Sequence, residues 1–579
     1  MLARLLIAIV VACATLAGPA APSRAAPPAG DFPWKQWSDD VFVRAKRENK
    51  FVLLSLQSWW CPWCHTMNEI TYADPAVRAY IDEHYIPVRV DQDSRPDISQ
   101  RYERWGWPAT VLFGPDGTEI VKLRGYYSPQ FFMPVLQETV KDPTPVDYGE
   151  PGGPERERLL AMALPAERRT ELVAFLDKVY DRDNDGWGKS KLVDGPTLTY
   201  ALERARGGDK QMETRIRRTL TRMTQLIDKD IGAIGQITKK PDWSEPSREF
   251  PMFAQEAALT AFSTAFVLWR DPEHRAAADR IFGFLKEKLA SPEGGFYTSM
   301  GMEKGEPGVD KTLYARETGQ AISGLLAYYD ATGVAEARGL ALRAAQWAVR
   351  ARGIPGGGFR HAAADSNGPF LADSLYMAQA LIELYRSTSD RRWLAQAQAA
   401  GEFIALNFVD ARTGGFLAST SPIASKFPPP VKQKDDNVAA VRMFNLLHFH
   451  TGEAKYRTLA EAGMGYLASP PIQDAYDFLP DVLLAEMEMT QEPVHVTVVG
   501  PRRDQRSGAL FRAALNYPTQ YKRAEWWDKT EGKLPNHDVD YPDYPEPAAF
   551  ACTRRFCSEP VTDPAKLAAA LDALQRDVR

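Results

Sequence analysis

A pair of cysteines placed directly after an apolar run is the feature that most constrains the fold of this chain. Residues 51–56 form a short, nearly continuous apolar segment, as expected of a buried parallel strand. The sequence Cys61-Pro62-Trp63-Cys64 follows, and a helical pattern continues beyond it. Proline is favoured in the first turn of a helix, where a backbone donor has no partner. We therefore expect Cys61 at the N-terminus of a helix that follows a buried strand.

The segments around the cysteine pair have the order of a thioredoxin-like α/β domain, which we expect over residues 31–141. An amphipathic helical pattern precedes the apolar run, and a strong turn at Gly114-Pro115-Asp116-Gly117 predicts a hairpin. The remaining expected elements are strands at 85–90, 109–113 and 119–123 and a final helix at 129–140. This arrangement places the two cysteines at one end of a central sheet.

The position of the cysteines predicts thiol–disulfide chemistry. A helix N-terminus stabilises a thiolate, so Cys61 is the expected nucleophile and the more buried Cys64 the resolving thiol. Two alternatives stay open: an inert disulfide, and a metal site that includes His65, for which no fourth ligand is visible locally. We expect no metal and no cofactor. The immediate environment of the dithiol consists of Trp60, Pro62, Trp63 and His65.

A second pattern points to the same chemistry. Pro108, in Gly106-Trp107-Pro108, lies just ahead of the expected strand at 109–113. Thioredoxin-like proteins begin the strand that faces the dithiol with a cis proline, and a cis X-Pro bond is uncommon. We predict that Pro108 is this residue and that it leaves the backbone of Trp107 free to pair with an incoming peptide.

Beyond residue 141 the pattern changes twice. Residues 142–154 are rich in proline and glycine and predict a linker. Residues 155–490 show only helical patterns, with Gly-Gly-Phe turns at 294–296, 357–359 and 414–416 that recur about every sixty residues. Six helical hairpins at this period predict a closed (α/α)6 toroid, with an open solenoid as the alternative.

A sugar site in such a barrel requires paired carboxylates or histidine bases. The candidates at expected helix ends are Glu249, Glu317, His361, Asp373 and Asp436, together with Asp185. Asp181, Asp183 and Asp185 also resemble the start of a calcium loop, although its twelfth position is Leu192 rather than glutamate. Aromatic residues that could bind carbohydrate or a partner are Trp187, Trp243, Phe296 and Phe359.

Residues 491–579 predict a small α/β segment. It begins with a strand near 495–499 and a helix from about 505, and residues 517–547 are expected to form a long surface loop. Cys552 and Cys557 form a second close pair, which is either a local disulfide or a second redox pair that exchanges electrons with Cys61 and Cys64.

These residues also resemble a known family. The motifs are Cys61-Pro62-Trp63-Cys64-His65, Asp74-Pro75, Val90-Asp91, Gly106-Trp107-Pro108 and Pro115-Asp116-Gly117, with later blocks at 370–373, 381–385, 435–437 and 552–561. They resemble the DUF255 thioredoxin-like proteins, which include bacterial YyaL-type proteins and animal relatives of the spermatogenesis-associated type. The resemblance implies a thioredoxin-like domain followed by a six-hairpin barrel of the glycosidase and sugar-epimerase type.

The sequence departs from the family pattern in two places. The family typically has Cys-His-Trp-Cys-His, whereas Pro62 stands here for the first histidine, as in ordinary exported thiol oxidoreductases. The barrel blocks at 251–255 and 301–303 also differ from the family pattern. These differences favour redox chemistry over a working sugar site.

The N-terminus predicts export. Residues 1–25 contain Arg4, a short apolar core and small residues, as in a secretory signal, and Cys13 offers a less favoured lipoprotein alternative. A periplasmic or secreted protein with no membrane span after cleavage is expected. The net charge of -5 argues against nucleic-acid binding.

The leading hypothesis is an exported thiol–disulfide oxidoreductase that acts on protein thiols or disulfides and whose barrel binds a substrate or partner. A carbohydrate-active barrel with an accessory thioredoxin-like domain is the alternative, and a non-catalytic binding protein is the third.

Overall fold

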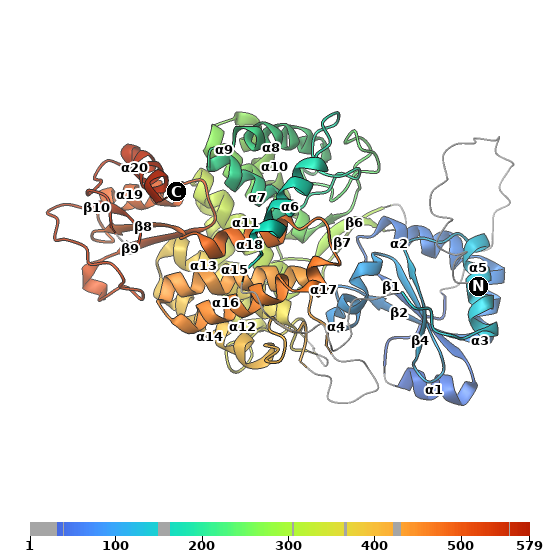
Figure 1. Ribbon diagram of the computed structural model, residues 1–579. Coiled ribbons are helices and arrows are strands. Elements are labelled where there is room, and N and C mark those ends of the chain that lie inside the picture. Colours follow the sequence, from blue (N-terminus) through green and yellow to red (C-terminus); the bar gives the residue numbers. More distant parts are fainter. Residues whose placement is uncertain are drawn as a thin grey trace.

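The computed structural model describes residues 32–38, 40–148, 163–303, 306–363, 368–420, 430–554 and 556–578. Figure 1 shows an α/β domain at one end of the molecule, a helical barrel in the middle and a small α/β segment at the other end. The predicted fold class is therefore confirmed. The expected signal at 1–25 and residues 149–154 of the expected linker lie outside the described residues. No described helix is both long and apolar enough to cross a membrane.

The N-terminal domain is built on a four-stranded mixed sheet in the order β2-β1-β3-β4. The strands are β1 (Phe51–Gln57), β2 (Tyr85–Asp91), β3 (Ala109–Phe113) and β4 (Glu119–Arg124); β1 and β2 are parallel and the other pairs antiparallel. The apolar run of residues 51–56 forms β1. Its side chains are nearly all apolar because both faces of the sheet are covered. One face packs on α1 (Asp40–Glu48) and α4 (Pro96–Ser99), the other on α3 (Pro75–His84) and α5 (Pro129–Lys141).

The cysteine pair opens a helix, as the sequence predicts. Helix α2 (Pro62–Thr66) follows β1 and continues as the π-helical turn η1 (Met67–Thr71). The peptide bond between Trp107 and Pro108 is cis, and Pro108 lies immediately before β3, as expected.

The barrel is a closed ring. Each inner helix contacts the next, and the last one contacts the first. The inner helices are α7 (Gly195–Arg206), α9 (Met252–Trp269), α11 (Ala315–Thr332), α13 (Leu371–Thr388), α15 (Lys434–Thr451) and α18 (Pro480–Thr490). Their outer partners are α8 (Lys210–Met223), α10 (Pro272–Phe284), α12 (Ala335–Ala351), α14 (Arg391–Asn407), α16 (Ala454–Leu467) and α6 (Ala166–Lys178). Because α6 pairs with α18, the beginning and end of this region close the toroid.

A repeated hydrogen bond explains the repeated Gly-Gly-Phe turns. The backbone N–H of Phe296, Phe359 and Phe416 each donates to a polar side chain in the next inner helix: Thr318, Ser374 and Asn437, respectively. Each acceptor is the fourth residue of its helix, α11, α13 or α15. Glycine is required beside the aromatic residue because a Cβ at Gly295 would lie 2.7 Å from the Trp347 ring. Phe296, Phe359 and Trp243 are buried in the core, so the expectation that they bind carbohydrate is wrong.

One expectation about the barrel region differs from the structure. The barrel region is not purely helical: β5 (Phe250–Pro251), β6 (Ser299–Glu303) and β7 (Glu306–Asp310) form a small sheet that extends toward the N-terminal domain (Figure 1). The sequence pattern missed it because β6 and β7 carry glycines and charges instead of an apolar run.

The C-terminal segment contains a three-stranded sheet in the order β10-β8-β9, with α19 (Gln505–Leu515) and α20 (Pro564–Val578) packed on it. The strands are β8 (Val494–Val499), β9 (Lys522–Trp527) and β10 (Ala548–Cys552). Strand β9 contradicts the expected surface loop at 517–547. It was missed because its buried residues Lys522, Arg523 and Glu525 are charged, and Arg523 and Glu525 pair with each other at 2.8 Å.

Candidate functional site

The dithiol lies at the N-terminus of α2. Cys61 is the N-cap residue, and its Sγ accepts a hydrogen bond from the backbone N–H of Cys64 at 3.1 Å. The two sulfur atoms are joined as a disulfide. Both cysteines are buried, with Cys61 3% and Cys64 1% exposed. This is the arrangement in which the free N–H groups of a helix end stabilise a thiolate at the first cysteine.

The dithiol faces the barrel. Trp60 packs edge-on against Phe253 of α9 with 5.6 Å between ring centroids, and Trp107 packs against the same small cluster as the cysteines. On the other side Trp63 is 54% exposed and stacks on Tyr126. The cysteines therefore lie where the two domains meet, with an exposed aromatic residue beside them.

His65 does not join the cysteines. Its Nε2 lies 2.8 Å from the backbone oxygen of Trp59, so the ring holds the loop before the motif. Among the residues that the structure describes, no three His, Cys, Asp or Glu side chains are grouped so that they could hold a metal ion. The role of His65 in this structure is to position the Trp59–Trp60 segment.

Three of the predicted barrel residues meet at one end of the barrel. Glu317 and Asp373 lie in the first turns of α11 and α13, and His361 lies in the turn before α13. His361 Nδ1 is 3.0 Å from both carboxylate oxygens of Asp373. Asp436, in the first turn of α15, lies at the same end, where Gln100 donates to it at 3.3 Å. Glu249 lies apart from them, near Trp59 and His65.

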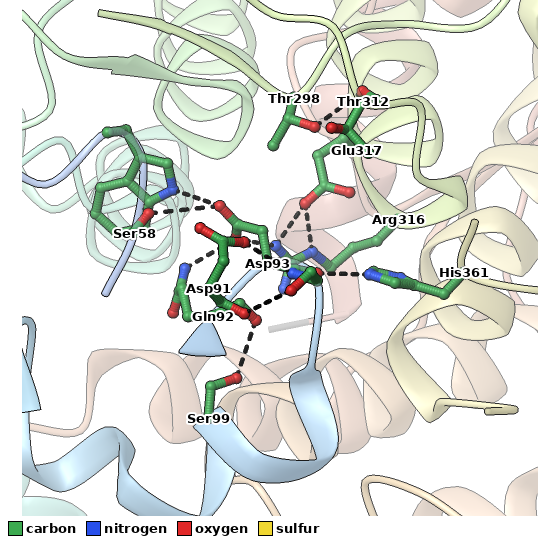
Figure 2. A network of polar contacts seen from close by, with 12 residues as sticks. Ser58, Asp91, Gln92, Asp93, Ser99, Thr298, Thr312, Arg316, Glu317 and His361 are labelled. Carbon is green, nitrogen blue, oxygen red and sulfur yellow. Dashed lines mark hydrogen bonds and ion pairs between the residues drawn. The ribbon is translucent and has the colours of Figure 1, made fainter. Parts of the chain in front are cut away.

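A buried aspartate of the N-terminal domain connects the dithiol loop to this cluster (Figure 2). Asp93 Oδ2 accepts a hydrogen bond from Trp60 Nε1 at 2.8 Å, and its Oδ1 pairs with Arg316 at 3.1 Å. Arg316 Nε also donates to Glu317 at 2.7 Å. The chain Trp60–Asp93–Arg316–Glu317 thus runs from the residue before Cys61 to the barrel.

Sequence reasoning missed Asp93 and Arg316. Asp93 follows the carboxyl end of β2, and the carboxyl ends of the parallel strands β1 and β2 meet at the edge where the dithiol lies. That topology was sufficient to place Asp93 near the cysteines. No local pattern identified Arg316, which lies 223 residues further along the chain.

His361 is held as a cation. Its Nδ1 faces the Asp373 carboxylate and its Nε2 lies 2.5 Å from the backbone oxygen of Asp93, so both ring nitrogens face acceptors. Only the protonated imidazolium donates from both nitrogens. Burial lowers the pKa of His361, but the Asp373 carboxylate outweighs it and the pKa is raised to about 9.

This geometry predicts a pH dependence. Because the pKa of His361 is raised from 6.5 to about 9 in the folded state, its contribution is fully present below pH 6.5 and is lost as the pH rises through 9. The contribution is about 3 kcal/mol at most. We expect the free energy of unfolding of His361→Gln to approach that of the wild type between pH 6 and pH 9.5, measured by urea denaturation. A gap between the two proteins that stays constant over this range would contradict the assignment.

The pKa values of two carboxyl groups at the same interface are also raised. Burial and the neighbouring Asp93 charge raise the pKa of Asp91 to about 7, and burial raises the pKa of Asp436 to about 7. Each of these groups gains charge as the pH rises through neutrality. The contact between the domains therefore becomes more negative and less favourable in alkaline solution.

The N-terminal domain covers the end of the barrel at which these residues gather. Gln100 contacts Asp436, and Gln433 donates to Glu103 at 2.7 Å. Asp373, Glu317 and His361 are each 2% exposed or less. The N-terminal domain therefore helps to shield this cluster from solvent.

Two other predicted features, the calcium loop and the second cysteine pair, have structural roles. The Lys191 ammonium lies 2.8 Å from Asp181 and Asp185 accepts from Tyr180, so a lysine occupies the expected calcium loop and the calcium interpretation is wrong. Cys552 and Cys557 are joined as a local disulfide beside β10. This pair lies in the segment opposite the N-terminal domain, with the barrel between them (Figure 1), so direct exchange with Cys61 within one chain is excluded in this arrangement.

Comparison with known proteins agrees with this architecture. Residues 28–140 match the family model described as "Protein of unknown function, DUF255". The N-terminal domain is thus similar to DUF255 domains over nearly its whole length, and we call it the DUF255 domain below. Residues 198–411 match the model of the β-L-arabinofuranosidase GH127 catalytic domain, which covers the inner helices α7, α9, α11 and α13. The chain therefore combines a domain that matches the DUF255 model with a barrel that matches a glycosidase catalytic-domain model over part of its length.

Curated relatives include spermatogenesis-associated protein 20 from Homo sapiens and from Mus musculus, each 23% identical over about half of this chain. The aligned part covers 46% of this chain and 38% of each relative, so the chain spans less than half of their length. Similar solved structures include cellobiose 2-epimerase from Bacillus thermoamylovorans (10% identity, 56% of this chain and 98% of that one, TM-score 0.47). A family 76 mannosidase from Bacteroides thetaiotaomicron is another (13% identity, 56% and 98%, TM-score 0.41).

Proposed function

We propose that this protein is a thiol–disulfide oxidoreductase that exchanges disulfides with protein thiols through Cys61 and Cys64. The observation that carries the proposal is the position of Cys61 as the N-cap of α2, with its Sγ 3.1 Å from the N–H of Cys64. A thiolate at this position is stabilised by the helix end and is both nucleophile and good leaving group. The enclosed Cys64 suits the resolving role.

The exchange balances without a further reactant. A substrate thiolate attacks Cys61 Sγ, the bond between Cys61 and Cys64 breaks, and Cys64 leaves as a thiolate. A second substrate thiolate then attacks the substrate sulfur of the mixed disulfide and releases Cys61 as a thiolate. The substrate loses two electrons and the dithiol gains them; the reverse order reduces a substrate disulfide.

Export to the periplasm or the cell exterior is part of this proposal. A disulfide-exchanging enzyme has oxidised substrates in such a compartment, and the pattern of residues 1–25 resembles a secretory signal. In the same proposal, Trp63 marks the side from which a protein substrate approaches, because it is the exposed residue of the motif and the other side is covered by Phe253.

The Cys64→Ser variant tests the assignment of the nucleophile. Without the resolving thiol, the mixed disulfide at Cys61 persists, so we expect covalent adducts with host proteins that disappear on reduction. The matched control is the double variant Cys61→Ser/Cys64→Ser, which should give no adduct. Adducts that persist in the double variant, or none in Cys64→Ser, would contradict the role of Cys61.

A carbohydrate-active barrel is the second candidate, because the match to a glycosidase catalytic domain covers residues 198–411. The cluster of Glu317, His361 and Asp373 at the barrel end supports it, and its burial beneath the DUF255 domain weighs against it. Turnover of a sugar panel separates the two candidates: it should survive Cys61→Ser and be lost in Glu317→Gln if the barrel is the catalytic part.

A further inference from the structure

A polar cavity lies inside the ring of inner helices, and neither cysteine of the dithiol lines it. Its volume is about 70 Å³, room for roughly five water molecules. Each of the six inner helices contributes to its wall, and the segment before β9 adds Gln520 and Tyr521. The polar side chains that line it are Thr199, Glu256, Thr260, Ser323, Gln379, Glu383, Arg442, Glu488, Gln520 and Tyr521.

The charges of this cavity do not balance. Arg442 forms a two-point ion pair with Glu488 at 2.8 and 2.9 Å, which neutralises one carboxylate. Glu256 and Glu383 form no ion pair with any described residue. Their contacts are neutral: Thr260 donates to Glu256 at 3.1 Å, and Gln379 donates to Glu383 at 3.2 Å. Two carboxylates from α9 and α13 therefore share a cavity in which Arg442, the cation among its described lining residues, is already ion-paired with Glu488.

Glu383 also has an unused hydrogen-bond acceptor. The residue is 7% exposed, and its Oε2 has no hydrogen-bond partner among the described residues. A buried carboxylate oxygen without a donor is costly, whereas the cost falls when a charged donor approaches. A protonated amine that donates hydrogen bonds would satisfy this oxygen.

The chemistry of the wall restricts which cation fits. Among the described residues, no three His, Cys, Asp or Glu side chains are grouped so that they could hold a metal ion. Hydroxyl and amide side chains of Thr199, Ser323 and Gln520 line the same space. They match a ligand that carries a hydroxyl group as well as a charge.

We propose that this cavity binds a small protonated amine bearing a hydroxyl group, with its ammonium held by the carboxylates of Glu256 and Glu383. The site is independent of the dithiol, so its ligand differs in class from the protein thiols proposed above. Burial and the charge of Glu383 raise the pKa of Glu256 to about 7. Glu383, Tyr376, Arg442 and Glu488 are the titratable groups that face it or the same cavity. The proton competes with the amine, so binding strengthens as the pH rises through 7.

Calorimetric titration of the full-length protein tests the proposal, with ethanolamine as the probe at pH 8. Ethylene glycol is the neutral isostere and ammonium chloride the bare cation. We expect saturable binding of ethanolamine, none of ethylene glycol, and an affinity at least about tenfold weaker in Glu383→Gln, as for the loss of one charge-assisted hydrogen bond. Absence of saturable binding, equal binding of ethylene glycol, or ammonium binding as tightly as ethanolamine would overturn it.

Thermal unfolding provides a second readout. It compares the Tm of each protein with and without ethanolamine, so a difference in stability between a variant and the wild type does not affect the comparison. Ethanolamine should raise the Tm of the wild type and of Glu287→Gln, an exposed control on the barrel exterior, and leave that of Glu383→Gln unchanged. Glu256→Gln is the second variant and should behave as Glu383→Gln does. An equal rise of the Tm in all four proteins would place the amine elsewhere and contradict the site.

Discussion

Replacing Arg316 with methionine is expected to lower the free energy of unfolding by about 3–5 kcal/mol, the cost typical of removing one partner from a buried ion pair. Arg316 is the cation between Asp93 of the DUF255 domain and Glu317 of the barrel, and the side chains of these two acids are 2% and 3% exposed. Without the guanidinium, each of these two buried carboxylates loses the ion-pair partner that the structure shows for it. Urea denaturation at pH 7 measures the loss.

Two further variants make this prediction specific. Arg350→Met removes an exposed arginine near the end of α12 and should leave the stability within about 0.5 kcal/mol of the wild type. Arg316→Met/Glu317→Gln should recover part of the loss, because the second change removes one of the stranded charges. A loss below about 1 kcal/mol in Arg316→Met, or the same loss in Arg350→Met, would show that the ion pair does not hold the two domains together.

The connection through Asp93 joins the loop that carries the dithiol to the barrel. Trp60 is hydrogen-bonded to Asp93 and packs on Phe253, so the residue before Cys61 is held by both domains. Movement of the DUF255 domain relative to the barrel would change the cover over Cys61 and over Glu317, His361 and Asp373 at the same time. The same interface thus covers both candidate sites.

Local sequence patterns were sufficient to predict the position of the dithiol and the elements around it. An apolar run followed by Cys-Pro-Trp-Cys specifies a strand and a helix start within fifteen residues, and Gly-Trp-Pro before a second apolar run specified Pro108. The barrel was also predictable, because Gly-Gly-Phe turns recur about every sixty residues between helical patterns, and each of these turns precedes an inner helix in the structure.

The interface was not predictable, because its partners are distant in sequence and individually ordinary. Asp93 and Arg316 are charged residues of a kind found on most surfaces, and only the packing of two domains brings them together. Strand β9 escaped detection for a related reason: Arg523 and Glu525 are buried as a pair, so its burial comes from charge pairing and has no apolar pattern. Periodicity predicts apolar burial and carries no information about buried ion pairs.

The rate of insulin reduction by dithiothreitol tests the central claim most directly. The account predicts that the wild-type protein accelerates the precipitation of insulin, that Cys61→Ser is indistinguishable from buffer, and that Cys552→Ser/Cys557→Ser retains the wild-type rate because that pair is a local disulfide at the other end of the molecule. Equal rates for the wild type and Cys61→Ser would contradict the proposal that the dithiol is the reactive centre.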